Sequence, residues 1–143
     1  MKTIIANPKD KEHIKLFKEY NKKLDLEYLN NKQPTEVKEI VFNIKDNSLN
    51  NISYIYGHND LKRCHMYFEN YDFKNIDFLN QVVDYAEKTL EMKNICFHIP
   101  YENNIITKLE GIGFDFIGKL DNEDTIIMEK IDQEEYTKET KRR

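Results

Sequence analysis

Two histidines and a glutamate stand in strand-like segments where they could transfer protons. The segment from Lys62 to Glu69 alternates as a β-strand does, which puts His65 and Glu69 on one face. His98 lies in a later apolar segment and comes close to that face if the two strands are neighbours. Imidazole and carboxylate groups are common general acids and bases near neutral pH. We therefore take His65, Glu69 and His98 as candidate catalytic residues, although half-buried sheet residues with ordinary hydrogen bonds would show the same pattern.

The two cysteines, Cys64 and Cys96, show no spacing that is typical of a metal site. The chain has neither Cys-x-x-Cys nor His-x-x-x-His, and alternation sends Cys64 and His65 to opposite faces of their strand. We therefore expect no metal site. Both cysteines lie in apolar segments, as small core residues do, and their number and placement indicate a reducing compartment such as the cytoplasm.

The positions of the candidate residues depend on the elements that carry them. Asp10 is a typical N-cap for a first helical region, which could form one long helix or two short ones. Its apolar stripe is Ile14, Phe17, Tyr20, Leu24 and Tyr28. Periodicity and turn residues predict strands at Lys2–Ala6, Val37–Lys45, Ile52–Gly57, Lys62–Glu69, Ile95–Ile99, Phe114–Lys119 and Thr125–Ile131, and helices at Asp77–Met92 and Glu102–Glu110, with turns at 46–51 and 57–60.

Length and composition favour one domain. The chain has 143 residues, 39% of them hydrophobic, and a net charge of −4, which suits a single core over residues 1–131 and a polar tail over residues 132–143. Acidic and basic residues are interspersed, so we expect no nucleic-acid partner. The sequence has no apolar run of about 18 residues and no apolar N-terminal stretch of signal-peptide length, so we expect no membrane association.

The element order and one local motif resemble those of the GNAT acyltransferases. The motif is the segment from Asn103 to Phe114, in which a short helix closes on Gly113-Phe114 before a strand. The resemblance implies an α/β (α+β) fold with a mixed, mostly antiparallel central sheet of six to seven strands, flanked by helices. It also implies acetyl-CoA as cosubstrate and a small-molecule or peptide amine as acceptor.

The resemblance further implies where the coenzyme binds. In the family, the pantetheine arm lies between the third meander strand and the next strand, and the pyrophosphate lies at the N-terminus of the intervening helix. The residues here that match those positions are Phe68, Asn70, Lys74, Asn75, Ile76, Asp77 and Asn103. Glu69 matches the position at which some members carry a carboxylate base.

Two departures from the family pattern leave the activity open. The family has glycines in the pyrophosphate loop, whereas the segment 71–77 has none and carries two acids, with Asp77 expected as the N-cap of the helix. The position of the family's tyrosine falls on Lys108 or Leu109. Three functions are therefore considered: an N-acetyltransferase, a non-catalytic binding or regulatory module with the same fold, and a structural protein that dimerises through the meander or the final strands.

Overall fold

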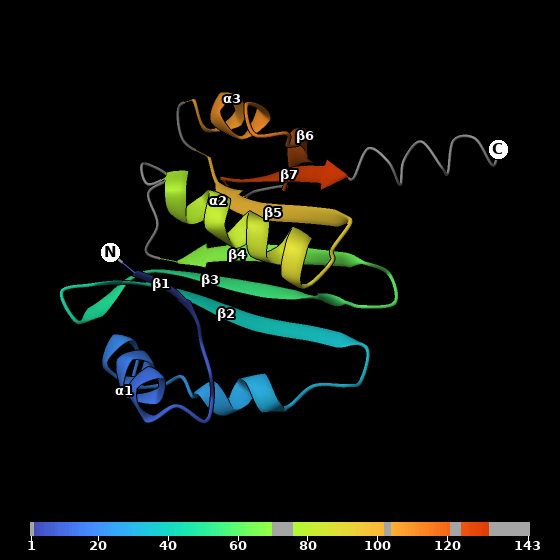
Figure 1. Cartoon of the computed structure of the whole chain (residues 1–143). Helices are drawn as coiled ribbons and strands as arrows, with labels where there is room; N and C mark the ends of the chain where they lie inside the picture. Colours follow the sequence, from blue (N-terminus) through green and yellow to red (C-terminus); the bar gives the residue numbers. More distant parts are fainter. Residues whose placement is uncertain (1, 70–75, 102–103, 121–123, 132–143) are drawn as a thin grey trace.

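Backbone hydrogen bonds join seven strands into one sheet, in the order β1-β2-β3-β4-β5-β7-β6. The computed structural model describes residues 2–69, 76–101, 104–120 and 124–131. Among the strand pairs of these residues, only β4 and β5 are parallel, and the other five pairs are antiparallel. The predicted α/β fold with a mixed, mostly antiparallel sheet is confirmed (Figure 1).

The described elements follow the predicted order closely. The strands are β1 (Lys2–Ile5), β2 (Glu36–Lys45), β3 (Ser48–His58), β4 (Arg63–Glu69), β5 (Asn94–Pro100), β6 (Asp115–Lys119) and β7 (Thr125–Ile131). The helices are α1 (Lys11–Tyr20), α2 (Ile76–Asp84) and α3 (Ile105–Glu110), with a 3₁₀ turn η1 (Leu26–Asn30) and a π-helical turn η2 (Tyr85–Thr89) that continues α2. No helix of the described residues is long and apolar enough to span a membrane.

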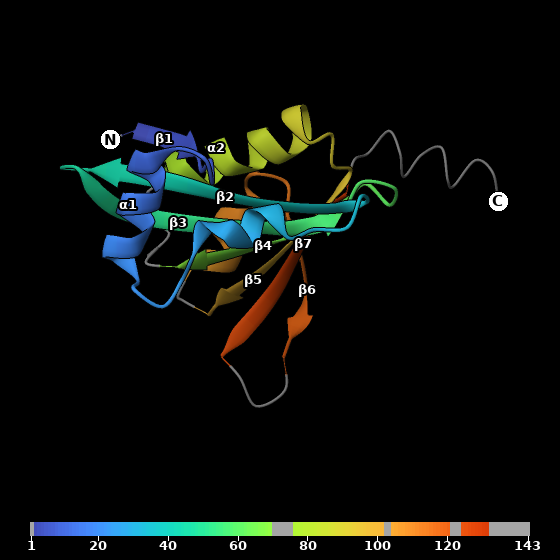
Figure 2. The ribbon, with the colours of Figure 1, turned by 90° about the horizontal axis from the view of Figure 1, so that it is seen from below.

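The sheet has a hydrophobic cluster on each face. On one face, Phe78 and Val82 of α2 pack against strand residues such as Phe97. On the other face, Phe17 of α1 stacks on Phe42 of β2, with ring centroids 5.9 Å apart. Seen from below, α1 and η1 lie over the β1–β3 half of the sheet, and no helix of the described residues lies in front of β5, β7 or β6 (Figure 2). Helices of the described part of the chain therefore cover only half of this second face.

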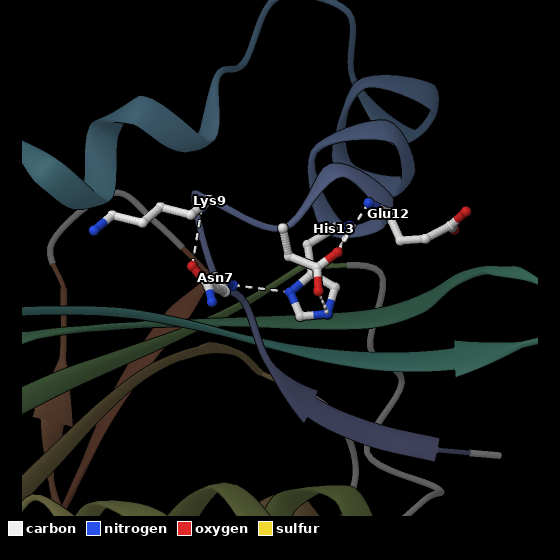
Figure 3. A network of polar contacts seen from close by, with 5 residues as sticks. Asn7, Lys9, Glu12 and His13 are labelled. Carbon is white, nitrogen blue, oxygen red and sulfur yellow. Dashed lines mark hydrogen bonds and ion pairs between the residues drawn. The ribbon is translucent and has the colours of Figure 1, made fainter.

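A network of polar contacts begins the first helix (Figure 3). The side chain of Asp10 accepts hydrogen bonds from the backbone N–H groups of Glu12 and His13, at 2.9 and 3.3 Å. The backbone N–H of Asn7 donates to Nδ1 of His13 at 2.9 Å. The two bonds to Asp10 satisfy N–H groups that a helix leaves free at its start, so the N-cap predicted at Asp10 is confirmed.

The first helical region forms two short helices, which was one of the two predicted alternatives, because α1 ends at Tyr20. Other predicted boundaries were wrong. The turn predicted at 46–51 is shorter: Asp46 and Asn47 adopt φ of 53° and 63°, which suits a two-residue hairpin, and β3 begins at Ser48. Asp77 is not the N-cap, because α2 already begins at Ile76, whose side chain packs on the core.

The other helix boundaries also differ from the prediction. The second helix leaves α-geometry at Tyr85 and ends as a π-helical turn at Thr89. The helix expected from Glu102 begins, in the described residues, at Ile105, whose side chain is buried. Residues 102 and 103 lie outside the described residues.

Gly57 allows β3 and β4 to approach closely, and replacing it should destabilise the sheet. A Cβ added to Gly57 would lie 2.7 Å from Cα of Cys64 and nearer still to the carbonyl oxygen of Arg63. We expect Gly57→Ala to lower the free energy of unfolding by about 1–3 kcal/mol or more, measured by urea denaturation. A Cβ at Gly118 would meet nothing within 4 Å, so Gly118→Ala should change stability by less than about 0.5 kcal/mol. Equal effects would contradict this explanation.

Candidate active site

The parallel strands β4 and β5 separate before either strand ends. Their paired residues run from Arg63↔Asn94 to Tyr67↔His98, whereas β4 continues to Glu69 and β5 to Pro100. Figure 1 shows the two ribbons parting toward the end of the sheet where α2 begins. Beyond Tyr67↔His98, the described ends of the two strands no longer pair with each other.

Glu69, at the diverging end of β4, accepts hydrogen bonds from two tyrosines. Oη of Tyr20, from α1, donates to Oε2 of Glu69 at 2.7 Å, and Oη of Tyr54, from β3, donates at 3.4 Å. Burial, and then the hydrogen bond to Glu69, raises the pKa of Tyr20 to about 12. Burial, and then the charge of Glu69, also raises the pKa of Tyr54. Both phenols therefore stay protonated donors near neutral pH and orient the carboxylate.

A cavity of about 830 Å³ lies on the half-covered face beside Glu69. Its lining comes from α1, η1, the segment between them, and strands β2, β3 and β4. The lining residues are Phe17, Lys23, Leu24, Asp25, Tyr28, Ile40, Tyr54, Tyr56, Tyr67 and Glu69. The two carboxylates outnumber the one ammonium group of the lining, that of Lys23. The cavity therefore favours a cationic group, which carboxylates attract by charge and ring faces by their quadrupole.

The structure brings two of the three candidate catalytic residues together and leaves the third apart. Nδ1 of His65 and Nε2 of His98 are 3.2 Å apart. Tyr67 stacks on His98, with ring centroids 5.1 Å apart. Burial, and then the neighbouring His98, lowers the pKa of His65, which favours the neutral imidazole. Within the described residues, Glu69 bonds tyrosines rather than either histidine, so the three do not form one proton-transfer chain.

The residues predicted to bind the coenzyme fall in two places. Phe68 points to the α2 face, where its ring packs edge-on against Phe78 and Phe97, with centroids 6.3 and 5.4 Å apart. Ile76 and Asp77 lie in the first turn of α2, with Ile76 partly buried and Asp77 exposed. The remaining predicted residues, Asn70, Lys74, Asn75 and Asn103, lie outside the described residues.

Tyr20 is the site residue that sequence reasoning missed. The sequence pattern placed Tyr20 only in the apolar stripe of the first helical region. In the structure, its hydroxyl donates a hydrogen bond to Glu69. The available signal in the sequence was a phenol in the middle of an apolar stripe, where an aliphatic side chain would pack as well. Three further tyrosines of β3 and β4 line the cavity: Tyr54, Tyr56 and Tyr67.

Similarity to known proteins is structural. No protein-family model matches the sequence, and no curated protein matches it. A variant of the spermidine N-acetyltransferase SpeG from Vibrio cholerae is 14% identical with a TM-score of 0.62, and the alignment covers 98% of this chain and 99% of that one. The N-acetyltransferase PseH from Campylobacter jejuni is 13% identical with a TM-score of 0.58, over 90% of this chain and 97% of that one.

A third similar structure was determined with coenzyme A. It is the PaiA N-acetyltransferase from Thermoplasma acidophilum, 12% identical with a TM-score of 0.56, over 92% of this chain and 99% of that one. These proteins are GNAT acetyltransferases, and the matches span nearly all of each chain. The chain therefore has the GNAT fold, which confirms the fold that the resemblance implied.

The hydrogen bond between Tyr20 and Glu69 should be measurable as a coupling between α1 and β4. We expect Tyr20→Phe and Glu69→Gln to show a coupling free energy of about 1 kcal/mol in a double-mutant cycle, because each single change removes the same charge-assisted bond. Urea denaturation measures the four stabilities. Tyr54→Phe, whose bond to Glu69 is longer at 3.4 Å, should couple less. Coupling within error of zero for Tyr20 would show that the bond does not form in solution.

Proposed function

We propose that the chain is an acyl-CoA-dependent N-acetyltransferase that transfers an acetyl group from acetyl-CoA to a primary amine. The observation that carries this proposal is the divergence of β4 and β5 after Tyr67↔His98, directly beside a carboxylate-containing aromatic cavity. Fold neighbours that are N-acetyltransferases, one of them in complex with coenzyme A, support it. The divergence fits a pantetheine arm, and the cavity fits an ammonium group.

In this proposal, Glu69 is the general base. Its carboxylate takes a proton from the ammonium group of the acceptor, directly or through one water molecule, and the neutral amine attacks the thioester carbonyl. The new C–N bond forms as the C–S bond breaks, and the departing coenzyme A thiolate takes up a proton. Tyr20 and Tyr54 orient the carboxylate. Tyr67 supplies an aromatic wall beside the amine.

The residues that would hold acetyl-CoA are the strand ends and the start of α2. Phe68 and Ile76 supply apolar contacts, and the first turn of α2 offers backbone N–H groups to the pyrophosphate. No tyrosine of α3 can protonate the thiolate, because the matching positions are an exposed Lys108 and a buried Leu109. Solvent is then the source of that proton.

A non-catalytic module with the same fold is the second candidate, and one feature favours it. The segment that should cradle the pyrophosphate, residues 71–77, contains no glycine. Asp77 also places a carboxylate in the first turn of α2, where the helix dipole would otherwise attract an anion. A chain of this kind would keep the amine cavity without transferring an acetyl group.

Acetyl-CoA binding and turnover separate the two candidates. At about 100 times its dissociation constant, acetyl-CoA should raise the free energy of unfolding by about 2.7 kcal/mol, measured by urea denaturation. Release of the coenzyme A thiol with a panel of primary amines measures turnover. Glu69→Gln should lower kcat by about 10²- to 10⁴-fold and keep the stabilisation by acetyl-CoA. Stabilisation without turnover by any amine would support the binding module, and no stabilisation at millimolar acetyl-CoA would refute the enzyme.

Asp77 should weaken coenzyme binding through its charge. We expect Asp77→Asn to tighten acetyl-CoA binding by about two- to fivefold at low ionic strength. This fold-change corresponds to the free energy of about 0.3–1 kcal/mol that a charge contributes at a helix terminus. Isothermal titration measures the dissociation constant. Asp84→Asn is the matched control, because Asp84 lies at the other end of α2 and pairs with Lys88 at 3.6 Å. Equal effects of the two changes would contradict a specific repulsion at the N-terminus.

A further inference from the structure

Three side chains that the proposed acetyl transfer does not use meet on the half-covered face of the sheet. His65 comes from β4, and Cys96 and His98 come from β5. One ligand atom of each lies within 4.8 Å of the ligand atoms of the other two. The register of the parallel pair places His65 directly opposite Cys96, and strand alternation then brings His98 to the same face.

We propose that His65, Cys96 and His98 form a binding site for a zinc ion, held by Nδ1 of His65, Sγ of Cys96 and Nε2 of His98. Two nitrogens that are each about 2.0–2.1 Å from one tetrahedral zinc ion lie about 3.4 Å apart, and a nitrogen and a sulfur lie about 3.6 Å apart. The two nitrogens here are 3.2 Å apart, and the sulfur lies within 4.8 Å of both. Small rotations of the three side chains complete the geometry.

The donor set selects the metal. Two imidazoles and a thiolate suit zinc, whereas magnesium and calcium prefer oxygen ligands. A bound zinc ion supplies the positive charge that stabilises the thiolate of Cys96, and the displaced proton goes to solvent.

A zinc ion at this site would link β4 to β5 where the two strands begin to separate. It takes one ligand from β4 and two from β5, next to Tyr67↔His98, the last residue pair before the strands separate. A bound ion therefore ties the two strands together at the base of the divergence. A fourth ligand can come from water. Among the described residues, no helix lies over β5 on the side that faces away from α2 (Figure 2).

The simpler alternative is a hydrogen bond between two neutral histidines beside a buried cysteine. That arrangement also explains a 3.2 Å separation of the two nitrogens. The two arrangements differ in the role of the Cys96 thiol. The thiol is a ligand in the zinc site, whereas it takes no part in a hydrogen bond between the histidines. The experiment therefore has to report on the sulfur as well as on the imidazoles.

Zinc titration of the metal-free full chain tests the proposal. The protein is stripped with a chelator, kept reduced with a phosphine, and titrated with zinc chloride against a chromophoric competitor, with magnesium chloride as the control salt. We expect one zinc ion per chain and no competition from magnesium. Cys96→Ser and His98→Gln should each weaken zinc binding by at least about tenfold. His58→Gln is the matched control, because His58 is a nearby histidine of β3 outside the three-residue cluster, and it should leave the affinity unchanged.

Cobalt reports on the sulfur directly. Co²⁺ in the wild-type protein should show a thiolate-to-cobalt charge-transfer band and the intense visible bands of a tetrahedral site, and Cys96→Ser should remove the charge-transfer band. If His98→Gln fails to fold, as judged by circular dichroism, the wild-type cobalt spectrum decides alone. Absence of zinc binding, or binding that survives both ligand replacements, overturns the proposal. Glu69→Gln should bind zinc as the wild type does, so failure of the acetyl-transfer proposal and failure of this one are separate results.

Discussion

The parallel pairing of β4 and β5, in a sheet that is otherwise antiparallel, is the constraint on which the site depends. A parallel pair needs a crossover connection, and here the described part of that crossover is α2 with η2. Its apolar side covers one face of the two strands, where Met66 and Phe97 are buried. Alternation then leaves His65, Cys96 and His98 on the opposite face. The crossover thus separates the hydrophobic core from the residues that can do chemistry.

The uneven cover of that opposite face creates the cavity. α1 and η1 pack over the β2 and β3 part of the sheet, through residues such as Phe17 and Leu26, and β4 lies at the margin of this layer. The cavity therefore has a helical wall on one side and the open strand face on the other. The hydrogen bond from Tyr20 to Glu69 joins the wall to the strand. Because it links elements on two sides of the cavity, it sets where the carboxylate points.

Local sequence patterns predicted most of the helices and strands. They did not predict which residues of different elements lie next to each other. The strand Thr125–Ile131 has the predicted bounds, and the predicted face of His65 and Glu69 is correct, because alternation depends only on the strand itself. The contact of Tyr20 with Glu69 depends on where α1 ends and how it packs. Cys96 meets His65 through the β4–β5 register, whereas the sequence argument compared His65 with Cys64, its neighbour on the same strand.

The charges of the molecule favour the proposed acceptor more than the proposed donor. Glu69 and Asp25 line the cavity and attract an ammonium group, while Asp77 stands where the coenzyme pyrophosphate would lie. A charge at a helix terminus is worth about 0.3–1 kcal/mol, and micromolar binding corresponds to about 8 kcal/mol. Asp77 alone can therefore weaken coenzyme binding but not abolish it. The heavier requirement is steric, because without glycine the backbone must reach the phosphates past its own Cβ atoms. In the proposed acetyltransferase, coenzyme binding would therefore depend chiefly on the diverging strand ends of β4 and β5.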